Sequence, residues 1–204
     1  KAFNNNEDIH KSTASKVFNV ELENVTKEQR SHAKVVNFGI IYGVSAFGLS
    51  NQTDLSRSES KEIIDNYYKS YPKLKEFTSN QIEFARSNGY VKTLLGRKRY
   101  LNDINSRNAI IRSSAERNAI NSPVQGTAAD IIKLAMIKID NELEKLKLKS
   151  KLILQVHDEL IFDCPKGEID IIKDMVQEKM QNAYKLNVPL KVDVGDGYNW
   201  LEAH

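Results

Sequence analysis

TKEQRSHAKVVNFGIIYG, residues 26 to 43, is the stretch around which the rest of the chain is organised. Thr26 followed by Gln29 matches a capping box, which predicts a helix that begins near Lys27. Two cations and two aromatic residues then recur every four positions, as Arg30, Lys34, Phe38 and Tyr42. On a helix this spacing stacks side chains turn above turn, so the cations lie at one end of a stripe and the rings at the other.

Two interpretations of this stripe are open. In the first, the helix is an ordinary amphipathic helix whose basic end is solvated and whose aromatic residues lie in the core. In the second, the cations bind phosphates and the rings meet a flat base, since guanidinium binds phosphate bidentately and ammonium acts as a mobile charge. Gly39 and Gly43 mildly favour the second, because each costs roughly 0.5–1 kcal/mol relative to Ala inside a helix and something should compensate.

The pattern Arg-x3-Lys-x3-Phe-Gly-x2-Tyr-Gly resembles the nucleotide-binding helix in the fingers of family A DNA polymerases. The resemblance runs from about Asp8 to His204, through GYVKTLLGRKRYL, AERNAINSPVQGTAAD, QVHDEL and GDGYNWLEAH in that order. It implies an α+β fold, with a helical fingers subdomain over most of residues 1–106. Residues 107–204 would then be mostly the C-terminal part of an antiparallel-sheet palm packed on helices.

The resemblance assigns the stripe to the incoming deoxynucleotide (dNTP). In the family, a His in the DIH context contacts the triphosphate, which implies that role for His10, although a lone helical His is otherwise a surface or capping residue. Arg30 and Lys34 would neutralise the triphosphate as catalytic side chains, and Lys34 would donate a proton to the leaving group. Phe38 and Tyr42 would frame the nascent base pair. Phe at the first of these positions is associated with rejection of dideoxynucleotides, which Phe38→Tyr should relax.

A later motif resembles the part of the family that meets DNA. The Arg and Asn of its ERxxxN pattern lie near template and primer, which implies DNA contacts for Arg117 and Asn121. Gln125 matches a glutamine that bonds bases in the minor groove near the primer end. A carboxamide both donates and accepts, so it can meet the acceptors of every base pair without preferring a sequence.

We expect Pro123 to break the helix of this region. Residues 108–121 would then form one helix and residues 128–146 another, capped by Thr127 and packed under a sheet, with Gln125 in the loop between them. Glu116 can pair with Arg112 at a spacing of four, so part of this charge is structural.

A hairpin is predicted for residues 90–100, where a basic trio, Arg97-Lys98-Arg99, follows Gly96. Such a trio suits contacts with the DNA backbone, but a solvated hairpin tip would also carry it.

LILQVHDELIFD, residues 152–163, predicts a second hairpin with His157 and Asp158 at its tip. A carboxylate at a strand end suits a divalent cation, although an exposed turn also commonly contains these residues. In the family this turn supplies one of two Asp residues that hold two Mg²⁺ ions. The resemblance therefore implies that Asp158 is a metal ligand and catalytic residue, with His157 lining the site beside the DNA. Glu159 would face away from Asp158 on a regular strand.

The activity implied is two-metal nucleotidyl transfer from a dNTP to a primer 3′-hydroxyl. The second metal-binding Asp of the family lies in an upstream DYSQIELR-like motif, which does not occur here, and Lys1 stands in place of an initiator Met. We therefore expect a fragment without the thumb, the start of the palm or any exonuclease domain, and without useful polymerase activity on its own. The NWxxAH tail is common at the family's end, so His204 is expected to be the natural C-terminus.

Composition sets only wide bounds. The 204 residues are 40% hydrophobic and 28% charged, as in ordinary globular proteins, and 30 basic against 27 acidic residues leave a net charge of only +3. A nucleic-acid-binding surface must therefore come from local clustering of basic residues. The single Cys164 excludes an internal disulfide, and no apolar run approaches the roughly 20 residues of a membrane span.

The resemblance implies primer–template DNA and dNTPs as partners, no membrane, a monomeric full-length enzyme and a place in the bacterial cytoplasm at the nucleoid. Two other classes stay open: a non-catalytic nucleic-acid-binding module, and a metal-dependent hydrolase built on His157 and Asp158. Towards the C-terminus we expect a helix over residues 169–184, a strand over residues 188–194 and Trp200 anchored against the sheet.

Overall fold

The computed structural model describes residues 2–203, apart from the side chain of Ile41. The chain forms two compact units, Lys1–Gln125 and Gly126–His204, and the division between them falls within one helix, α6 (Ala109–Leu146). Helices predominate, with small antiparallel sheets, which confirms the α+β class expected from the sequence.

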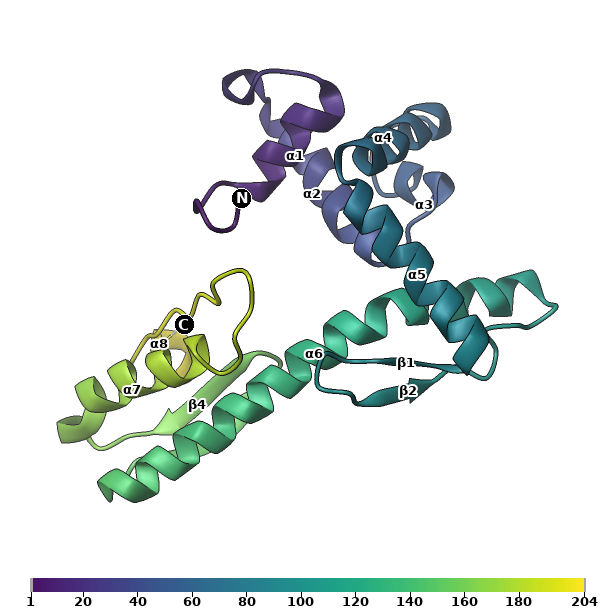
Figure 1. Cartoon of the computed structure of the whole chain (residues 1–204). Coiled ribbons are helices and arrows are strands. Elements are labelled where there is room, and N and C mark those ends of the chain that lie inside the picture. Colours follow the sequence, from purple (N-terminus) through teal and green to yellow (C-terminus); the bar gives the residue numbers. More distant parts are fainter. Residues whose placement is uncertain (1, 204) are drawn as a thin grey trace. The chain divides into compact units, whose positions relative to one another are not determined.

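Helices form the first part of the first unit, and α1 packs on both α2 and α4 (Figure 1). Their bounds are α1 Ile9–Phe18, the 3₁₀-helix η1 Leu22–Asn24, α2 Lys27–Ile41, α3 Ala46–Ser50, α4 Arg57–Ser70 and α5 Pro72–Asn88. One apolar cluster joins the first four α-helices through Val17, Val36, Ile40, Leu49, Ile63 and Tyr67. This core fixes the side of α2 that faces inward and leaves its opposite side exposed.

A second cluster in the same unit holds a hairpin against α5 and the first part of α6. Strands β1 (Tyr90–Lys92) and β2 (Lys98–Tyr100) form the hairpin that the sequence predicted, and they pair antiparallel with Val91 opposite Arg99. The buried members of the cluster are Ala85, Val91, Leu101, Ile104, Ala115 and Ala119. The first unit therefore extends its core into α6.

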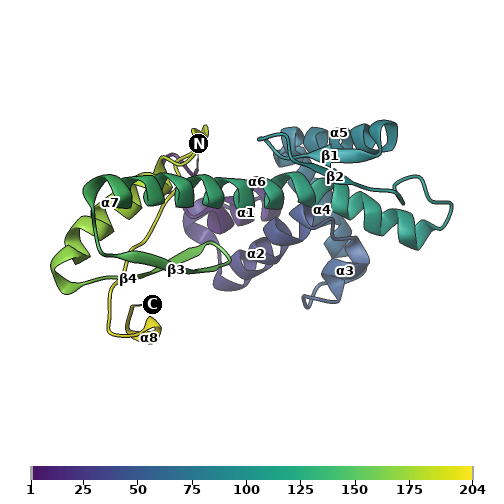
Figure 2. The same ribbon diagram turned by 90° about the horizontal axis from the view of Figure 1, so that it is seen from below.

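The expected break at Pro123 is wrong, because α6 is one continuous helix of 38 residues (Figure 2). Thr127 consequently lies inside the helix and is buried there, where it cannot cap a new one. Proline in a helix costs about 3 kcal/mol, whereas a fully buried Ile contributes roughly 1.5–3 kcal/mol. Ile120 before the proline and Ile132 after it are both buried, so packing on the two sides outweighs the cost of the ring.

The second unit packs one face of a hairpin against helices, as expected for this region. Its bounds are β3 Lys151–Val156, β4 Glu159–Asp163, the 3₁₀-helix η2 Lys166–Glu168, α7 Ile169–Gln181 and α8 Trp200–Ala203. The buried cluster consists of Ile139, Leu143, Ile172, Met175 and Val176, and Leu160 and Phe162 of β4 pack against it. The end of α6 and the length of α7 thus cover the sheet.

Two expectations for the end of the chain are wrong. The segment 188–194 is not a strand, because β3 and β4 are the only strands of the second unit's described residues and offer it no pairing. Instead, the side chain of Gln177 on α7 donates to Val192 O at 2.9 Å. Trp200 is half exposed and lies outside the apolar cluster. His204 lies outside the described residues.

Candidate functional site

Helix α2 begins as its sequence predicts. Thr26 Oγ1 accepts from Gln29 N at 3.1 Å, and Gln29 Oε1 accepts from Thr26 N at 3.0 Å, which completes the capping box. Two otherwise unpaired donors at the start of the helix are thereby satisfied. This fixes the register in which the stripe residues are presented.

The stripe faces outward. Phe38 is 49% and Tyr42 50% exposed, and Arg30 and Lys34 are exposed as well. The core instead takes Ala33, Val36 and Ile40 from the same helix. The interpretation that placed the aromatic residues in the core is therefore wrong, and the ligand-binding interpretation keeps its geometric basis.

A hollow of about 820 Å³ lies along the stripe, within the first unit. Its lining includes Lys34, Phe38, Tyr42 and Gly43 from the stripe, with Ser113 and Arg117 from α6. The volume suits a nucleotide-sized ligand, and the lining offers what such a ligand needs, namely cations beside aromatic faces. The hollow therefore joins residues that the sequence had assigned to two different ligands.

Gly39 lies inside α2 and Gly43 directly after its C-cap residue Tyr42, and both glycines are closely packed. Gly43 has φ +70°, and a Cβ there would lie 2.9 Å from Arg117 Cγ. A Cβ on Gly39 would lie 2.8 Å from Val44 Cγ1. Bare backbone lets neighbouring side chains approach closely at both positions. The cost expected of a glycine inside a helix applies to Gly39 alone, because Gly43 lies outside α2 in a left-handed conformation that glycine adopts readily.

His10 lies beside this stripe. Its ring centroid is 5.7 Å from that of Phe38, and Nδ1 lies 3.0 Å from the side-chain nitrogen of Asn37. Burial lowers the pKa of His10 first; Asp8 opposes this shift, and Arg30 and Lys34 add to it. The sequence analysis missed Asn37, because nothing in the spacing of the chain links it to a histidine 27 residues away.

Arg30 is tied to the helix that carries His10. Its Nε donates to Asp8 Oδ2 at 2.7 Å, and Asp8 Oδ1 caps α1 by accepting from the backbone nitrogens of His10 and Lys11. The hydrogen bond from Arg30 is the main reason why the pKa of Asp8 lies below its ordinary value. The bond uses Nε, so the terminal nitrogens of the guanidinium remain for another acceptor.

The continuous helix α6 aligns the three predicted DNA contacts. Arg117, Asn121 and Gln125 are four residues apart, so they form one stripe on α6. Arg117 Nη1 donates to Ser113 Oγ at 3.1 Å, and Gln125 is exposed. Among the described residues, Asn121 Oδ1 is buried without a hydrogen-bond partner. The stripe therefore offers amide and guanidinium groups with spare hydrogen-bonding capacity.

Neighbouring charges on α6 serve the fold. Glu116 pairs with Arg112 at 3.9 Å, as predicted, but its closer partner is Arg86 at 2.6 Å, which the sequence analysis missed. This ion pair fastens α5 to α6 within the first unit.

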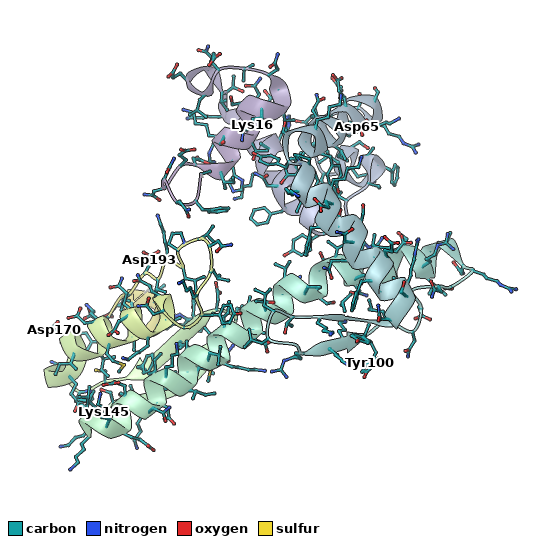
Figure 3. The ribbon with its side chains drawn as sticks, viewed as in Figure 1. Lys16, Asp65, Tyr100, Lys145, Asp170 and Asp193 are labelled. Atoms are coloured by element: carbon teal, nitrogen blue, oxygen red, sulfur yellow. The ribbon has the colours of Figure 1, made fainter. Side chains whose placement is uncertain are left out.

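The basic trio lies on the exposed hairpin that ends at Tyr100, which is labelled in Figure 3. Lys98 Nζ lies 4.4 Å from the centre of the Tyr90 ring, and Arg99 donates to Asn118 at 3.5 Å. Part of the trio's charge is therefore engaged within the protein.

In the second unit, His157 and Asp158 form the predicted hairpin tip. Val156 pairs with Glu159 across it, His157 adopts φ +53°, and Gln155 Nε2 donates to His157 O at 3.0 Å. Both tip side chains are exposed. The tip is thus a short turn whose backbone is held by a side-chain hydrogen bond.

The tip fits a divalent cation only in part. Asp158 supplies a hard oxygen ligand on a rigid support, as Mg²⁺ requires. Mg²⁺ prefers six ligands, of which proteins usually supply one or two carboxylates. However, no three His, Cys, Asp or Glu side chains of the described residues gather where they could hold a metal. Asp158 is therefore one ligand of the right chemistry and not a complete site.

Among the described residues, no helix is both long and apolar enough to cross a membrane.

Comparison with known proteins gives consistent matches. The sequence model of "DNA polymerase family A" matches residues 1–202. DNA polymerase I of Caldicellulosiruptor bescii is 54% identical over 98% of this chain, and that of Bacillus subtilis is 48% identical over 99%. The chain spans 24% and 23% of the length of these two relatives, respectively.

A solved structure agrees with the sequence relatives. The POL domain of Pol1 from M. smegmatis, in complex with DNA primer-template and dNTP, matches 99% of this chain with a TM-score of 0.92 and 43% identity. The match covers 36% of that chain. Together with the family model, which spans nearly all of the sequence, these matches show that the chain belongs to DNA polymerase family A.

Proposed function

We propose that this chain is the nucleotide-binding part of a DNA-directed DNA polymerase that transfers nucleotides from dNTPs to a primer 3′-hydroxyl. The observation that carries the proposal is the exposed stripe that begins on α2. Lys34, Phe38 and Tyr42 of this stripe line one hollow together with Arg117 of α6, and His10 lies beside Phe38. The relatives are DNA polymerases, and the similar structure holds primer-template and dNTP. An enzyme of this kind works on the chromosome, so its proposed place is the bacterial cytoplasm at the nucleoid.

In this proposal the first unit binds the nucleotide. Arg30 and Lys34 neutralise the triphosphate, and His10 donates a hydrogen bond to it. Phe38 and Tyr42 bracket the new base pair, and Lys34 protonates the leaving group. Charge-assisted hydrogen bonds from guanidinium and ammonium to phosphate are roughly twice as strong as neutral ones, which makes the triphosphate the main source of affinity.

Primer–template DNA is proposed to lie along the α6 stripe of Arg117, Asn121 and Gln125, with His157 beside it and the basic trio against the phosphate backbone. The backbone contacts would fix the register, and Gln125 would check pair geometry without reading identity. We propose that residues 1–106 are mostly fingers and residues 107–204 mostly palm. The compact units divide later, after Gln125, within the helix that would join the two subdomains.

Asp158 would hold Mg²⁺ in the working enzyme. Two such ions would lower the pKa of the primer hydroxyl and stabilise charge at the reacting phosphate. Because Asp158 is the single carboxylate that the chain is proposed to give, we propose that the second comes from an upstream segment and that this chain alone does not extend primers. The full-length enzyme is proposed to act as a monomer.

Primer extension with Mg²⁺ and all four dNTPs tests the proposal. It compares this chain with an extended chain that continues upstream through the thumb and the second Asp. We expect extension by the extended chain only, and its loss on Asp158→Ala. Asp163→Ala is the matched control, because Asp163 is also exposed and lies at the other end of β4.

Other outcomes would decide between the alternatives. Extension by the short chain would mean that the metal ligands have been misassigned. An extended chain that binds DNA and never extends it would favour a non-catalytic binding module. Mg²⁺-dependent cleavage of DNA that requires Asp158 would favour a hydrolase.

A further inference from the structure

A buried chain of hydrogen bonds lies behind His10, within the first unit. Asn37 Nδ2 lies 3.0 Å from His10 Nδ1, and Asn37 Oδ1 accepts from Thr13 Oγ1 at 3.1 Å. Thr13 Oγ1 lies in turn 3.2 Å from the Tyr71 hydroxyl. Thr13 is 0% and Asn37 9% exposed, so water does not compete for these groups.

The donors and acceptors of this chain can be assigned. Thr13 has one hydroxyl proton, which it donates to Asn37 Oδ1, so Tyr71 must be the donor in its bond to Thr13. With its oxygen turned to Thr13, the Asn37 amide presents its NH₂ group to His10. An imidazole nitrogen that faces an NH₂ donor must act as an acceptor, so the ring proton resides on Nε2.

We propose that Asn37, oriented by Thr13, is a positioning residue that holds His10 as the neutral tautomer with its proton on Nε2 and so directs a hydrogen-bond donor at a phosphate oxygen of the incoming nucleotide. The inference rests on the proposed function, because it assumes that His10 meets the triphosphate. It adds the reason why a neutral histidine can serve there: its donor is fixed in direction before the nucleotide arrives, which lowers the cost of ordering on binding.

The surrounding charges agree with a neutral ring. Protonation of Nδ1 would place two donors against each other at the bond to Asn37. Burial, Arg30 and Lys34 lower the pKa of His10, and only Asp8 raises it. Asp8 is itself bound to Arg30, whose charge offsets its own. In this proposal Arg30 and Lys34 neutralise the charge of the phosphates, and neutral His10 contributes a hydrogen-bond donor of fixed direction.

The first test measures dNTP binding and turnover separately in the extended chain. Thr13→Val keeps the shape of the side chain and removes the hydroxyl, while Thr13→Ser keeps the hydroxyl. We expect Thr13→Val to raise the KM for dNTP about fivefold, the equivalent of one neutral hydrogen bond, with a smaller change in kcat. Thr13→Ser should restore most of the loss, which a purely steric role for Thr13 would not predict.

The second test reads the tautomer directly. In the 204-residue chain, ¹⁵N NMR should show His10 with a protonated Nε2 and an unprotonated Nδ1, with His32 on the same chain as an internal reference. Thr13→Val should produce a mixture of tautomers. The inference is overturned if the ring proton of the unaltered chain resides on Nδ1, or if Thr13→Val changes neither the tautomer nor the KM.

Asn37→Asp tests the positioning role by reversing the tautomer that residue 37 favours in His10. A carboxylate would accept from Nδ1–H, so neutral His10 would turn an unprotonated Nε2 towards the phosphates. The KM should then be high at alkaline pH and fall as the pH drops below the pKa of His10 in this variant, where Nε2 gains a proton. Arg30 and Lys34 stay charged over this range, and a KM that does not depend on pH in this variant would overturn the inference.

His10→Ala separates this inference from the proposed function. If His10→Ala leaves the KM for dNTP unchanged, the triphosphate role of His10 is wrong and the inference fails with it. If His10→Ala raises the KM while the Thr13 and Asn37 variants leave both KM and tautomer unaltered, the proposed function stands and the positioning role alone is wrong.

Discussion

At the scale of single residues, Gly43 and Gly89 show how the surroundings determine the free-energy cost of replacing a glycine. Both adopt positive φ, at +70° and +75°. A Cβ on Gly43 would lie 2.9 Å from Arg117, whereas a Cβ on Gly89 would meet nothing within 4 Å. A non-glycine residue would therefore be strained at both positions, but only at position 43 would its Cβ also collide with Arg117.

We expect Gly89→Ala to lower the free energy of unfolding by about 1 kcal/mol, the cost of left-handed backbone alone. Gly43→Ala should cost about 1–3 kcal/mol more, because it must also push the Arg117 side chain away from α2. Urea denaturation of both variants measures the difference. Equal losses of unfolding free energy in the two variants would show that the Arg117 side chain moves aside without an energetic cost.

At the scale of elements, Asp8 joins two helices through one side chain. It caps α1 and accepts from Arg30 on α2, and this hydrogen bond lowers its pKa. A lowered pKa in the folded state means that the ionised carboxylate stabilises the fold above its unfolded pKa of about 3.9. The contribution is lost as pH falls through the lowered folded value.

Asp8→Asn should separate the two functions of this side chain, because Asn also caps helices but carries no charge. We expect it to cost at most about 1 kcal/mol, as for an exposed ion pair, and to remove Asp8's share of the acid sensitivity. Asp8→Ala should cost about 1 kcal/mol more through the lost cap. Unfolding measured at neutral pH and below pH 4 checks both, with Glu7→Gln as a neighbouring acid outside the cap. An Asn variant with unchanged acid sensitivity would contradict the account.

Pro123 tests the continuity of α6. Since the helix already runs through this position, Pro123→Ala restores an N–H that can donate to the carbonyl of Ala119. We expect an increase in unfolding free energy of about 1–3 kcal/mol with no gain in helix content. Far-UV circular dichroism and denaturation measure the two quantities, and Val124→Ala, at an exposed neighbouring position, is the control. A clear gain in helix content would mean that α6 is broken here after all.

The sequence predicted those elements whose local signals and packing agree. The capping box at Thr26 and the turn at His157 both lie where the chain's own residues place them. It failed where tertiary packing overrides a local signal, as at Pro123, and where a strand-like segment has no strand to pair with. The Asn37 network could not be predicted, because its members come from separate elements and no spacing relates them.

At the scale of the whole molecule, the proposed functions are divided between units with separate cores. The stripe, His10 and the hollow belong to the first unit, and the Asp158 turn belongs to the second. Binding of a nucleotide and its reaction should therefore respond to different substitutions. This separation gives a test that does not require a complete active site.

We expect this chain to bind a dNTP through its triphosphate and to lose that affinity when the stripe is altered. Lys34→Ala or Arg30→Ala should weaken binding about tenfold or more, the equivalent of one charge-assisted hydrogen bond, and added salt should reduce the difference. Lys145→Ala removes the same charge from the second unit and should have little effect, as should Asp158→Ala when no Mg²⁺ is present. Isothermal titration with a dNTP and with its nucleoside measures the contribution of the phosphates. If Lys145→Ala weakened binding as much as Lys34→Ala, the affinity would reflect the net charge of the chain and not the α2 stripe. If the nucleoside bound as tightly as the dNTP, the cations of the stripe would have another function.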